Sequence, residues 1–173
     1  MNIYSFTGRC ANSIQDTTTG KSLFIDILPF DKTDLKQVLK KNRWKFNWRD
    51  EFKNKNHCIY KLVIRNGTVI QGLISIEKMP NFIEMHLIET APHNYGRNKK
   101  YTRVPGNLVA YICKMSFDSG FEGVVSFMPK TGLIQHYINT LGAELIYKNK
   151  MAINTSNAKK LLYLYYKNYT HVR

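Results

Sequence analysis

The chain has 173 residues, of which 43% are hydrophobic and 13% aromatic, so it is not disordered as a whole and can bury a core. No apolar run approaches the roughly 18 residues of a membrane-spanning helix, and the first residues lack the basic and apolar regions of a secretory signal. The 26 Lys and Arg outweigh the 12 Asp and Glu by a formal charge of +14, which attracts nucleic acids, anionic membrane surfaces or phosphate-rich small molecules. We therefore expect a basic cytoplasmic protein without membrane insertion.

The first half of the sequence predicts a strand, a helix and three further strands. The segment KSLFIDILPF (21–30) is typical of a strand, and DKTDLKQVLKKNRW (31–44) has apolar residues at helical spacing behind capping residues. Two β-rich runs in 57–79 surround Asn66-Gly67, a favoured hairpin turn. The alternating segment FIEMHLIET (82–90) is expected to form the next strand.

The second half predicts alternating helices and strands. Its elements are a helix over 103–120, a buried strand at 123–129, a helix over 131–142 starting at Thr131, a strand over 144–154 bent at 148–150, and a helix over 155–169 capped by Thr155 or Ser156. The order β-α-β-β-β-α-β-α-β-α predicts an α/β fold, a mixed central sheet with helices on both faces. We expect a single domain over 1–173, with the N-terminal strand and helix in 21–45.

Cysteines and histidines give no sign of a metal site. Cys10, Cys58 and Cys113 are odd in number, far apart and without CxxC spacing, which indicates reduced thiols. His93 and His136 have no ligand-like spacing to acids or cysteines. The sequence therefore predicts neither a disulfide framework nor a bound metal.

The start of the helix at 103–120 has features of a phosphate site. The first N–H groups of a helix lack intrahelical partners and lie at the positive end of its dipole. Pro105 suits the first turn of a helix, and Gly106 has no side chain to cover the backbone N–H groups. Asn107 and Leu108 offer further N–H groups. Arg103 adds a planar guanidinium, whose geometry suits a phosphate. These features predict a cradle for phosphate or pyrophosphate, although many helices begin near Gly or Pro for conformational reasons alone.

The order of these elements resembles the GNAT superfamily of N-acetyltransferases. Its members carry a strand, the motif R/Q-x-x-G-x-G/A, a helix, a buried strand and a second helix that ends in a signature like Y-x-x-x-x-G-F. Here RVPGNL (103–108) matches the first motif at Arg103 and Gly106, but Leu108 replaces the last Gly or Ala.

The second motif of the family falls in HYINTLGAEL (136–145). Tyr137 lies five residues before Gly142, and Ala143 replaces Phe. The resemblance covers about residues 59–153. A second departure is the longer connection before Arg103, whose basic insert (93–102) is either a lid or phosphate-contacting loop or a solvated loop.

The resemblance implies a GNAT-like acyl-CoA N-acyltransferase fold and an acetyl-CoA-dependent N-acetyltransferase. The cofactor-binding residues that it implies come from the central strand and the helix start, and they are Ile88, Thr90, Arg103, Val104, Gly106, Asn107 and Leu108. It implies direct transfer of the acetyl group to an amine in a ternary complex. The acceptor would be a small molecule or a macromolecule, including a polyanionic one such as tRNA.

Three residues are predicted to be catalytic on the basis of the resemblance. Tyr137 would protonate the departing thiolate, and its alternative role is packing on an apolar helix stripe. Glu84, His86 and Glu89 are the available bases for deprotonating the amine, directly or through water, and Glu89 is favoured, with Glu84 in reserve. Strict alternation along 82–90 places Glu84 and His86 on one face and Glu89 on the other.

Two other functions remain open at this stage. The charge and the segment RWKFNWRDEF (43–52), where Trp44, Phe46 and Trp48 alternate with basic residues, also suit a nucleic-acid-binding protein, unless the tryptophans are buried. The departure at Leu108 leaves room for a catalytically inactive CoA-binding protein. An exposed edge near the C-terminal strand could pair two copies into a homodimer.

Overall fold

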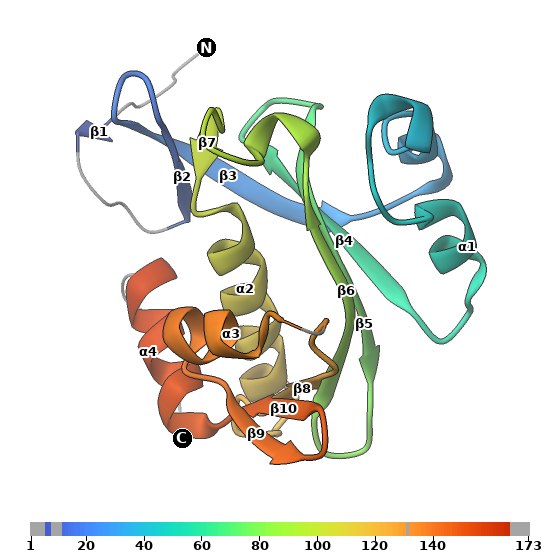
Figure 1. The fold of residues 1–173 in the computed structure, drawn as a ribbon, viewed down its shortest axis with the longest axis vertical. Coiled ribbons are helices and arrows are strands. Elements are labelled where there is room, and N and C mark those ends of the chain that lie inside the picture. Colours follow the sequence, from blue (N-terminus) through green and yellow to red (C-terminus); the bar gives the residue numbers. More distant parts are fainter. Residues whose placement is uncertain (1–5, 8–11, 131, 167–173) are drawn as a thin grey trace.

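The fold is a long curled sheet with helices on both faces, as Figure 1 shows for the computed structural model. The structure describes residues 6–7, 12–130 and 132–166. The strands are β1 (Phe6–Thr7), β2 (Ser13–Asp16), β3 (Lys21–Pro29), β4 (Cys58–Ile64), β5 (Ile70–Lys78), β6 (Ile83–Thr90), β7 (Tyr101–Thr102), β8 (Val125–Phe127), β9 (Glu144–Tyr147) and β10 (Lys150–Ile153). The helices are α1 (Trp48–Lys53), α2 (Val104–Asp118), α3 (Ile134–Leu141) and α4 (Thr155–Tyr165), with 3₁₀ turns at Lys32–Lys36, Lys40–Asn42 and Pro92–Asn94.

Strand order confirms the predicted mixed sheet. The path is β7-β2-β3-β4-β5-β6-β8-β10-β9, with β1 added beside β3. All neighbours are antiparallel except β6 and β8, which run parallel. Only Ile83–Met85 of β6 pairs with Val125–Phe127 of β8, so the two strands separate beyond Met85. That separation opens the middle of the sheet.

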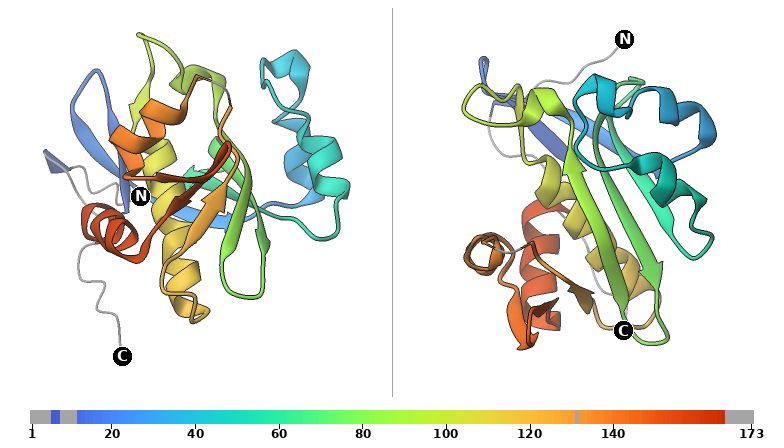
Figure 2. Two further views of the ribbon diagram at one scale, coloured as in Figure 1. Left: turned by 60° about the horizontal axis from the view of Figure 1, so that its bottom comes forward. Right: turned by 45° about the vertical axis from the view of Figure 1, so that its right-hand side comes forward.

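Two apolar cores cover the two faces of the sheet. The larger one joins the sheet to α2 and α4, and the smaller one joins the other face to the 3₁₀ turns and α1. Figure 2 shows α2 and α4 on one side and α1 on the other. Close approach of α2 requires Gly72 on β5, since a Cβ there would lie 2.6 Å from the Val104 side chain. No helix within the described ranges is long and apolar enough to cross a membrane.

The predicted elements appear with several corrections. The expected helix over 31–44 is instead two short 3₁₀ turns, the first of them held by an Asp31 capping box. The strand over 144–154 is a tight hairpin, β9 and β10, because Lys148 adopts a left-handed conformation with φ +46°. Thr131 lies outside the described residues, and the helix after it begins at Ile134.

The C-terminal helix also differs from the prediction at both ends. Its N-cap is Asn154, whose side chain accepts the N–H of Asn157, rather than Thr155 or Ser156. The described helix ends at Tyr165, and the predicted stretch 167–169 lies outside the described residues.

The basic insert 93–102 joins the sheet. Its end forms β7, which pairs with β2, a strand that the sequence did not predict. Thr17 donates its backbone N–H to the carbonyl of Lys100 at 3.0 Å and its hydroxyl to that of Lys99 at 2.6 Å. The insert is therefore anchored on the N-terminal hairpin rather than detached from the fold.

Candidate active site

Two cavities meet where β6 separates from β8. The first, of about 450 Å³, is called here the α2 cavity and is lined by Ile88, Glu89, Thr90, Tyr95, Arg103, Pro105, Gly106, Val109, Leu133, His136, Tyr137, Thr140, Leu141 and Tyr165. The second, of about 500 Å³, is called the Phe46 cavity and is lined by Lys45, Phe46, Met85, His86, Leu87, Ile88, Tyr95, Phe127, Met128, Lys130, Leu133 and Tyr137. Both volumes are typical of small-molecule sites, which span about 300–1,000 Å³.

The two cavities share four lining residues. These are Ile88, Tyr95, Leu133 and Tyr137. They come from β6, the basic insert, the loop before α3, and α3 itself. A molecule in one cavity can therefore touch a molecule in the other at this junction, as direct group transfer requires.

The start of α2 forms one end of the α2 cavity. Arg103 is the N-cap, in a left-handed conformation with φ +73°, and Pro105 and Gly106 line the cavity. Because Pro105 has no N–H, the unpaired amides of this first turn are those of Val104 and Gly106. The Asn107 N–H instead donates to the Arg103 carbonyl at 3.1 Å.

Three of the predicted cofactor-binding residues lie with their side chains in the core. Val104, Asn107 and Leu108 are each at most 1% exposed. The Asn107 amide donates to the Ser13 and Arg103 carbonyls, both at 2.8 Å, and so ties α2 to β2. The expectation that Asn107 and Leu108 offer free N–H groups is wrong for Asn107. Leu108 is the next residue of the helix, where the backbone N–H bonds to the carbonyl one turn earlier. The Leu108 side chain, which replaces the Gly or Ala of the family motif, therefore lies in the core and not in the α2 cavity.

Tyr165 of α4 covers the bare backbone at Gly106. A Cβ built on Gly106 would lie 1.9 Å from the Tyr165 hydroxyl. The Arg103 guanidinium stacks on the Tyr165 ring, 4.9 Å from its centroid, and donates to the Leu164 carbonyl at 3.0 Å. The C-terminal helix thus occupies space beside the predicted phosphate cradle, which the sequence analysis did not anticipate.

Tyr137 lies at the junction of the two cavities. It is half-buried, and its ring makes an edge contact with Phe127 at a centroid distance of 5.1 Å. Burial raises the pKa of Tyr137 above its ordinary value near 10. The phenol therefore carries its proton at neutral pH and can donate it to an anion formed at the junction.

Glu89 is buried and holds the segment before α1. It is 2% exposed, and its carboxylate accepts the Lys45 N–H at 2.6 Å, the Phe46 N–H at 3.3 Å and the Trp48 indole N–H at 2.8 Å. These three bonds place Lys45 and Phe46 in the wall of the Phe46 cavity. Glu89 also lines the α2 cavity.

Glu84 lies at the paired end of β6, away from both cavities. It accepts the Ser126 hydroxyl at 2.8 Å and forms an ion pair with Lys150 at 3.1 Å. Neither cavity includes it in its lining. The structure thus brings Glu89 and Tyr137 to the same place but does not bring Glu84 there.

A β-bulge corrects the predicted division of faces. Met85 pairs with Ile76 and Leu87 with Ser75, so His86 is an extra residue in β6. The extra residue shifts the alternation of side chains by one position after His86. Glu84 and Glu89 therefore point to the same face of the sheet, the one covered by α1. The strict alternation that placed them on opposite faces is wrong.

Tyr95, which the sequence analysis missed, completes the junction. It lies on the basic insert and is 43% exposed, while the pKa of its phenol is raised first by burial and then by the nearby Glu89 carboxylate. The anchored position of the insert, rather than any motif, brings Tyr95 to β6. No pattern in the sequence marked it.

The two tryptophans of 43–52 are buried in the smaller core. Trp44 is 5% and Trp48 0% exposed, so neither can stack on a nucleic-acid base. Only Phe46 of the three aromatic residues lines a cavity. The predicted stacking platform of Trp44, Phe46 and Trp48 is therefore wrong for both tryptophans.

One cluster of metal-type ligands occurs among the described residues, formed by β5, β6 and the residue before β4. It comprises His57, Glu77 and His86, with the two imidazole rings stacked at a centroid distance of 3.9 Å. His57 Nδ1 lies 2.6 Å from a Glu51 oxygen, and its Nε2 lies 3.1 Å from the Asn54 amide. Both ring nitrogens of His57 thus have protein partners already.

The fold has many solved counterparts, whereas no protein-family model and no curated sequence matches the chain. A putative acetyltransferase of the GNAT family from Desulfovibrio desulfuricans superposes with a TM-score of 0.57 at 9% identity, covering 76% of this chain and 99% of that one. A chimera of the spermidine N-acetyltransferase of Vibrio cholerae gives 0.57 at 11% identity, covering 78% and 98%. A mutant of the AtaT toxin, bound to the C-terminus of the antitoxin AtaR and to acetyl-CoA, gives 0.56 at 12% identity, covering 80% and 98%. At these identities the likeness concerns the fold.

Proposed function

From the premise that this chain has the GNAT acetyltransferase fold, we propose that it is an N-acetyltransferase that uses acetyl-CoA as its donor. The observation that carries the proposal is the meeting of two cavities at Tyr137, where β6 leaves β8. The α2 cavity would take the donor and the Phe46 cavity the amine. The separation of β6 from β8 would then allow the donor and the amine to touch each other at the junction of the two cavities.

The donor would be held by the bare backbone at the start of α2. Arg103 and the amides of Val104 and Gly106 suit a pyrophosphate, and Ile88 and Thr90 line the wall along which the pantetheine arm would run. Acetyl-CoA supplies a thioester that an amine can attack, with a thiolate as leaving group. Tyr137 holds at its phenolic oxygen the proton that this thiolate needs.

We propose that Glu89 acts first as a positioning residue. Three N–H donors already occupy its carboxylate, which leaves it less able to accept the proton of the amine. Solvent water can take that proton instead. The base role of Glu89 predicted from the sequence stays a prediction. The place of Glu89 in the lining of the α2 cavity is compatible with that role.

Binding of CoA tests the proposal before any acceptor is known. A ligand present at 100 times its Kd stabilises the native state by about 2.7 kcal/mol, which for a chain of this size raises Tm by roughly 5–10 °C. We expect such a rise with CoA or acetyl-CoA in thermal unfolding. Absence of any rise at millimolar CoA, in a sample with a cooperative transition, would overturn the proposal.

A screen for thiol release then separates an active enzyme from an inactive CoA-binding protein. Purified protein is mixed with acetyl-CoA and a panel of amines, and free CoA thiol is measured with a disulfide dye. An active transferase releases thiol only when an acceptor is present. A protein that binds CoA but does not release thiol with any amine of the panel would instead fit the inactive alternative.

Removal of the Tyr165 side chain is expected to tighten CoA binding. The ring covers Gly106 and stacks on Arg103, so a phosphate at the helix start must displace it. Losing that cation–π contact costs about 0.5–1 kcal/mol, and Tyr165→Ala should therefore lower the Kd of CoA by about 2–5-fold in calorimetry. Tyr163→Ala, on the same helix at 85% exposure, is the control. Weaker binding by Tyr165→Ala would mean that its hydroxyl helps to hold the phosphate.

A further inference from the structure

The Phe46 cavity carries positive charge and no acidic side chain among its lining residues. Its polar lining consists of Lys45, Lys130 and His86, and the remainder is apolar or aromatic. Glu89 lies nearby, but its carboxylate is turned toward the backbone of 45–46 and the Trp48 indole. An amine with a second cationic group would thus meet charges of its own sign on entering.

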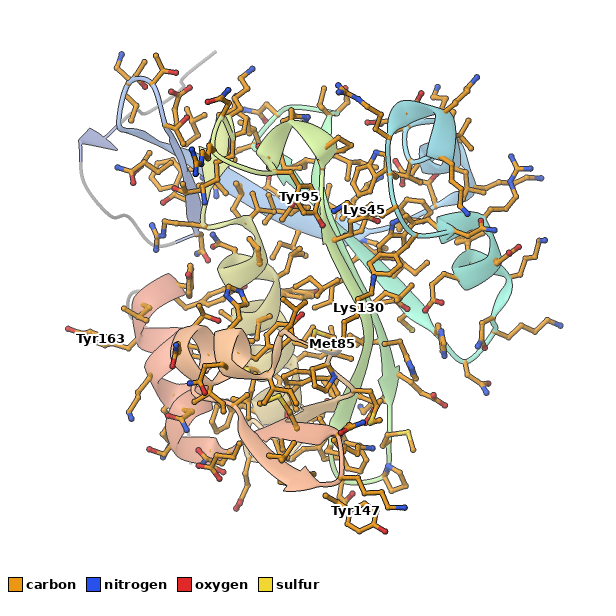
Figure 3. All side chains as sticks on the ribbon, viewed as in Figure 1. Lys45, Met85, Tyr95, Lys130, Tyr147 and Tyr163 are labelled. Atoms are coloured by element: carbon orange, nitrogen blue, oxygen red, sulfur yellow. The ribbon has the colours of Figure 1, made fainter. Side chains whose placement is uncertain are left out.

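The two ammonium groups are held at the cavity by aromatic rings. Lys45 Nζ lies 4.2 Å from the centroid of Tyr95, and Lys130 Nζ lies 4.0 Å from the centroid of Phe46. Figure 3 shows Lys45 beside Tyr95, with Lys130 farther along β6 in the direction of Met85. Within the part of the chain that the structure describes, neither ammonium has a carboxylate oxygen within 4.0 Å.

The lysines stand close to the point of proposed transfer. Tyr95, under Lys45, lines the junction of the two cavities, and Phe46, under Lys130, is fixed by the Glu89 carboxylate. Both lysines and Tyr137 line the same cavity of about 500 Å³, so an anion bound by either ammonium group would share that cavity with the Tyr137 phenol. The exposed apolar side chains of Met128 (60%) and Leu133 (38%) add a hydrophobic wall to the same cavity.

We propose that the acceptor is an amine whose own molecule carries a carboxylate or phosphate group, which Lys45 and Lys130 bind while the amine reaches the junction. This inference rests on the proposed function and narrows its substrate class. Lysine ammonium groups pair with either anion as point charges, and the aromatic wall favours an apolar body between amine and anion. A polyamine does not meet these requirements.

Matched pairs of amines test the proposal. 4-(Aminomethyl)benzoate is compared with benzylamine, which lacks only the carboxylate, and glucosamine 6-phosphate is compared with glucosamine. We expect at least one anionic member to exceed its partner about 10-fold or more in kcat/KM for thiol release. The pair whose two members differ in kcat/KM identifies the preferred anion as carboxylate or phosphate.

The double variant Lys45→Met/Lys130→Met isolates the two lysines. It should reduce the preference to less than about 3-fold while leaving the Kd of CoA unchanged. The control, Lys55→Met/Lys159→Met, removes the same charge at exposed positions outside both cavities and should keep the full preference. An unchanged preference in Lys45→Met/Lys130→Met would overturn the proposal, as would equal or better use of the uncharged or polycationic amines by the wild-type protein.

A binding measurement keeps the two proposals distinguishable. The same amines are titrated by calorimetry, with and without CoA, which needs no turnover. Preferential binding of an anionic amine that is lost in Lys45→Met/Lys130→Met supports the anion subsite even if CoA itself fails to bind. Binding of CoA together with no discrimination between paired amines removes the anion subsite and leaves the transferase proposal standing.

Discussion

Tyr137→Phe is expected to lower kcat for thiol release by about 10²-fold or more, because the substitution removes the proton donor at the junction of the two cavities. Phenylalanine keeps the ring that contacts Phe127, so the Tm and the Kd of CoA should change little. Steady-state kinetics with saturating acetyl-CoA measures the loss. A reduction in kcat without an equal reduction in CoA affinity is what a group acting in the transition state predicts.

The pH dependence follows from the raised pKa of Tyr137. A phenol whose pKa lies above 10 stays protonated across the neutral range, so Tyr137 itself should not reduce the rate until the pH exceeds about 10. Below that pH the rate should rise as the amine loses its proton. The same sign holds for stability: the folded protein favours the neutral phenol, and this contribution is lost only as the pH rises through the pKa of the folded state.

Tyr147→Phe is the matched control for this substitution. Tyr147 lies on β9, is 67% exposed, and lines neither cavity, as its position in Figure 3 illustrates. Its substitution removes the same hydroxyl and should leave kcat unchanged. Wild-type turnover by Tyr137→Phe would remove Tyr137 from the mechanism and leave its packing role.

Glu89→Gln is expected to destabilise the fold as well as reduce activity. The carboxylate accepts three N–H groups in a buried site, whereas an amide offers one oxygen and turns its NH₂ toward a donor. One or two buried donors then lack partners, at about 1–3 kcal/mol each, which corresponds to a fall in Tm of roughly 2–24 °C. Thermal unfolding followed by circular dichroism measures this fall.

Glu84→Gln provides the comparison on the same strand. Glu84 accepts one hydroxyl and pairs with Lys150, whose side chain is 35% exposed, so the amide can keep the first bond and a smaller fall in Tm is expected. An unchanged Tm for Glu89→Gln would show that its three bonds are not needed to hold the 45–48 segment. Kinetics of Glu89→Gln below its Tm also tests the base role: near-normal kcat would leave Glu89 as a positioning residue only.

The sequence predicted that Glu89 belongs to the site, but it did not predict which groups Glu89 binds. The resemblance picked Glu89 and Tyr137 from a strand and a helix 48 residues apart, and the structure brings both to one cavity. The donors to Glu89 come from residues 45–48, whose position depends on how the chain after β3 returns across the sheet. No spacing rule connects that segment to β6. The buried indole was therefore expected only as packing.

Local patterns determined most elements of this protein, because helix and strand periodicity, Asn-Gly turns and helix-ending glycines act over a few residues. They sufficed for the β4–β5 hairpin, for β6, for α2 and for α3 ending at Gly142, and the order of these elements predicted a mixed sheet. Where the pattern was weak, as in 31–44, packing against the sheet replaced the expected helix with 3₁₀ turns.

Only the tertiary structure decided which of these groups meet. One extra residue at His86 reversed the facing of everything after it in β6, α4 brought Tyr165 over Gly106, and the anchored insert brought Tyr95 to the junction. Each contact joins residues far apart in the chain and depends on strand register or helix docking. A sequence specifies such contacts through the packing of the whole molecule, so no short motif can reveal them.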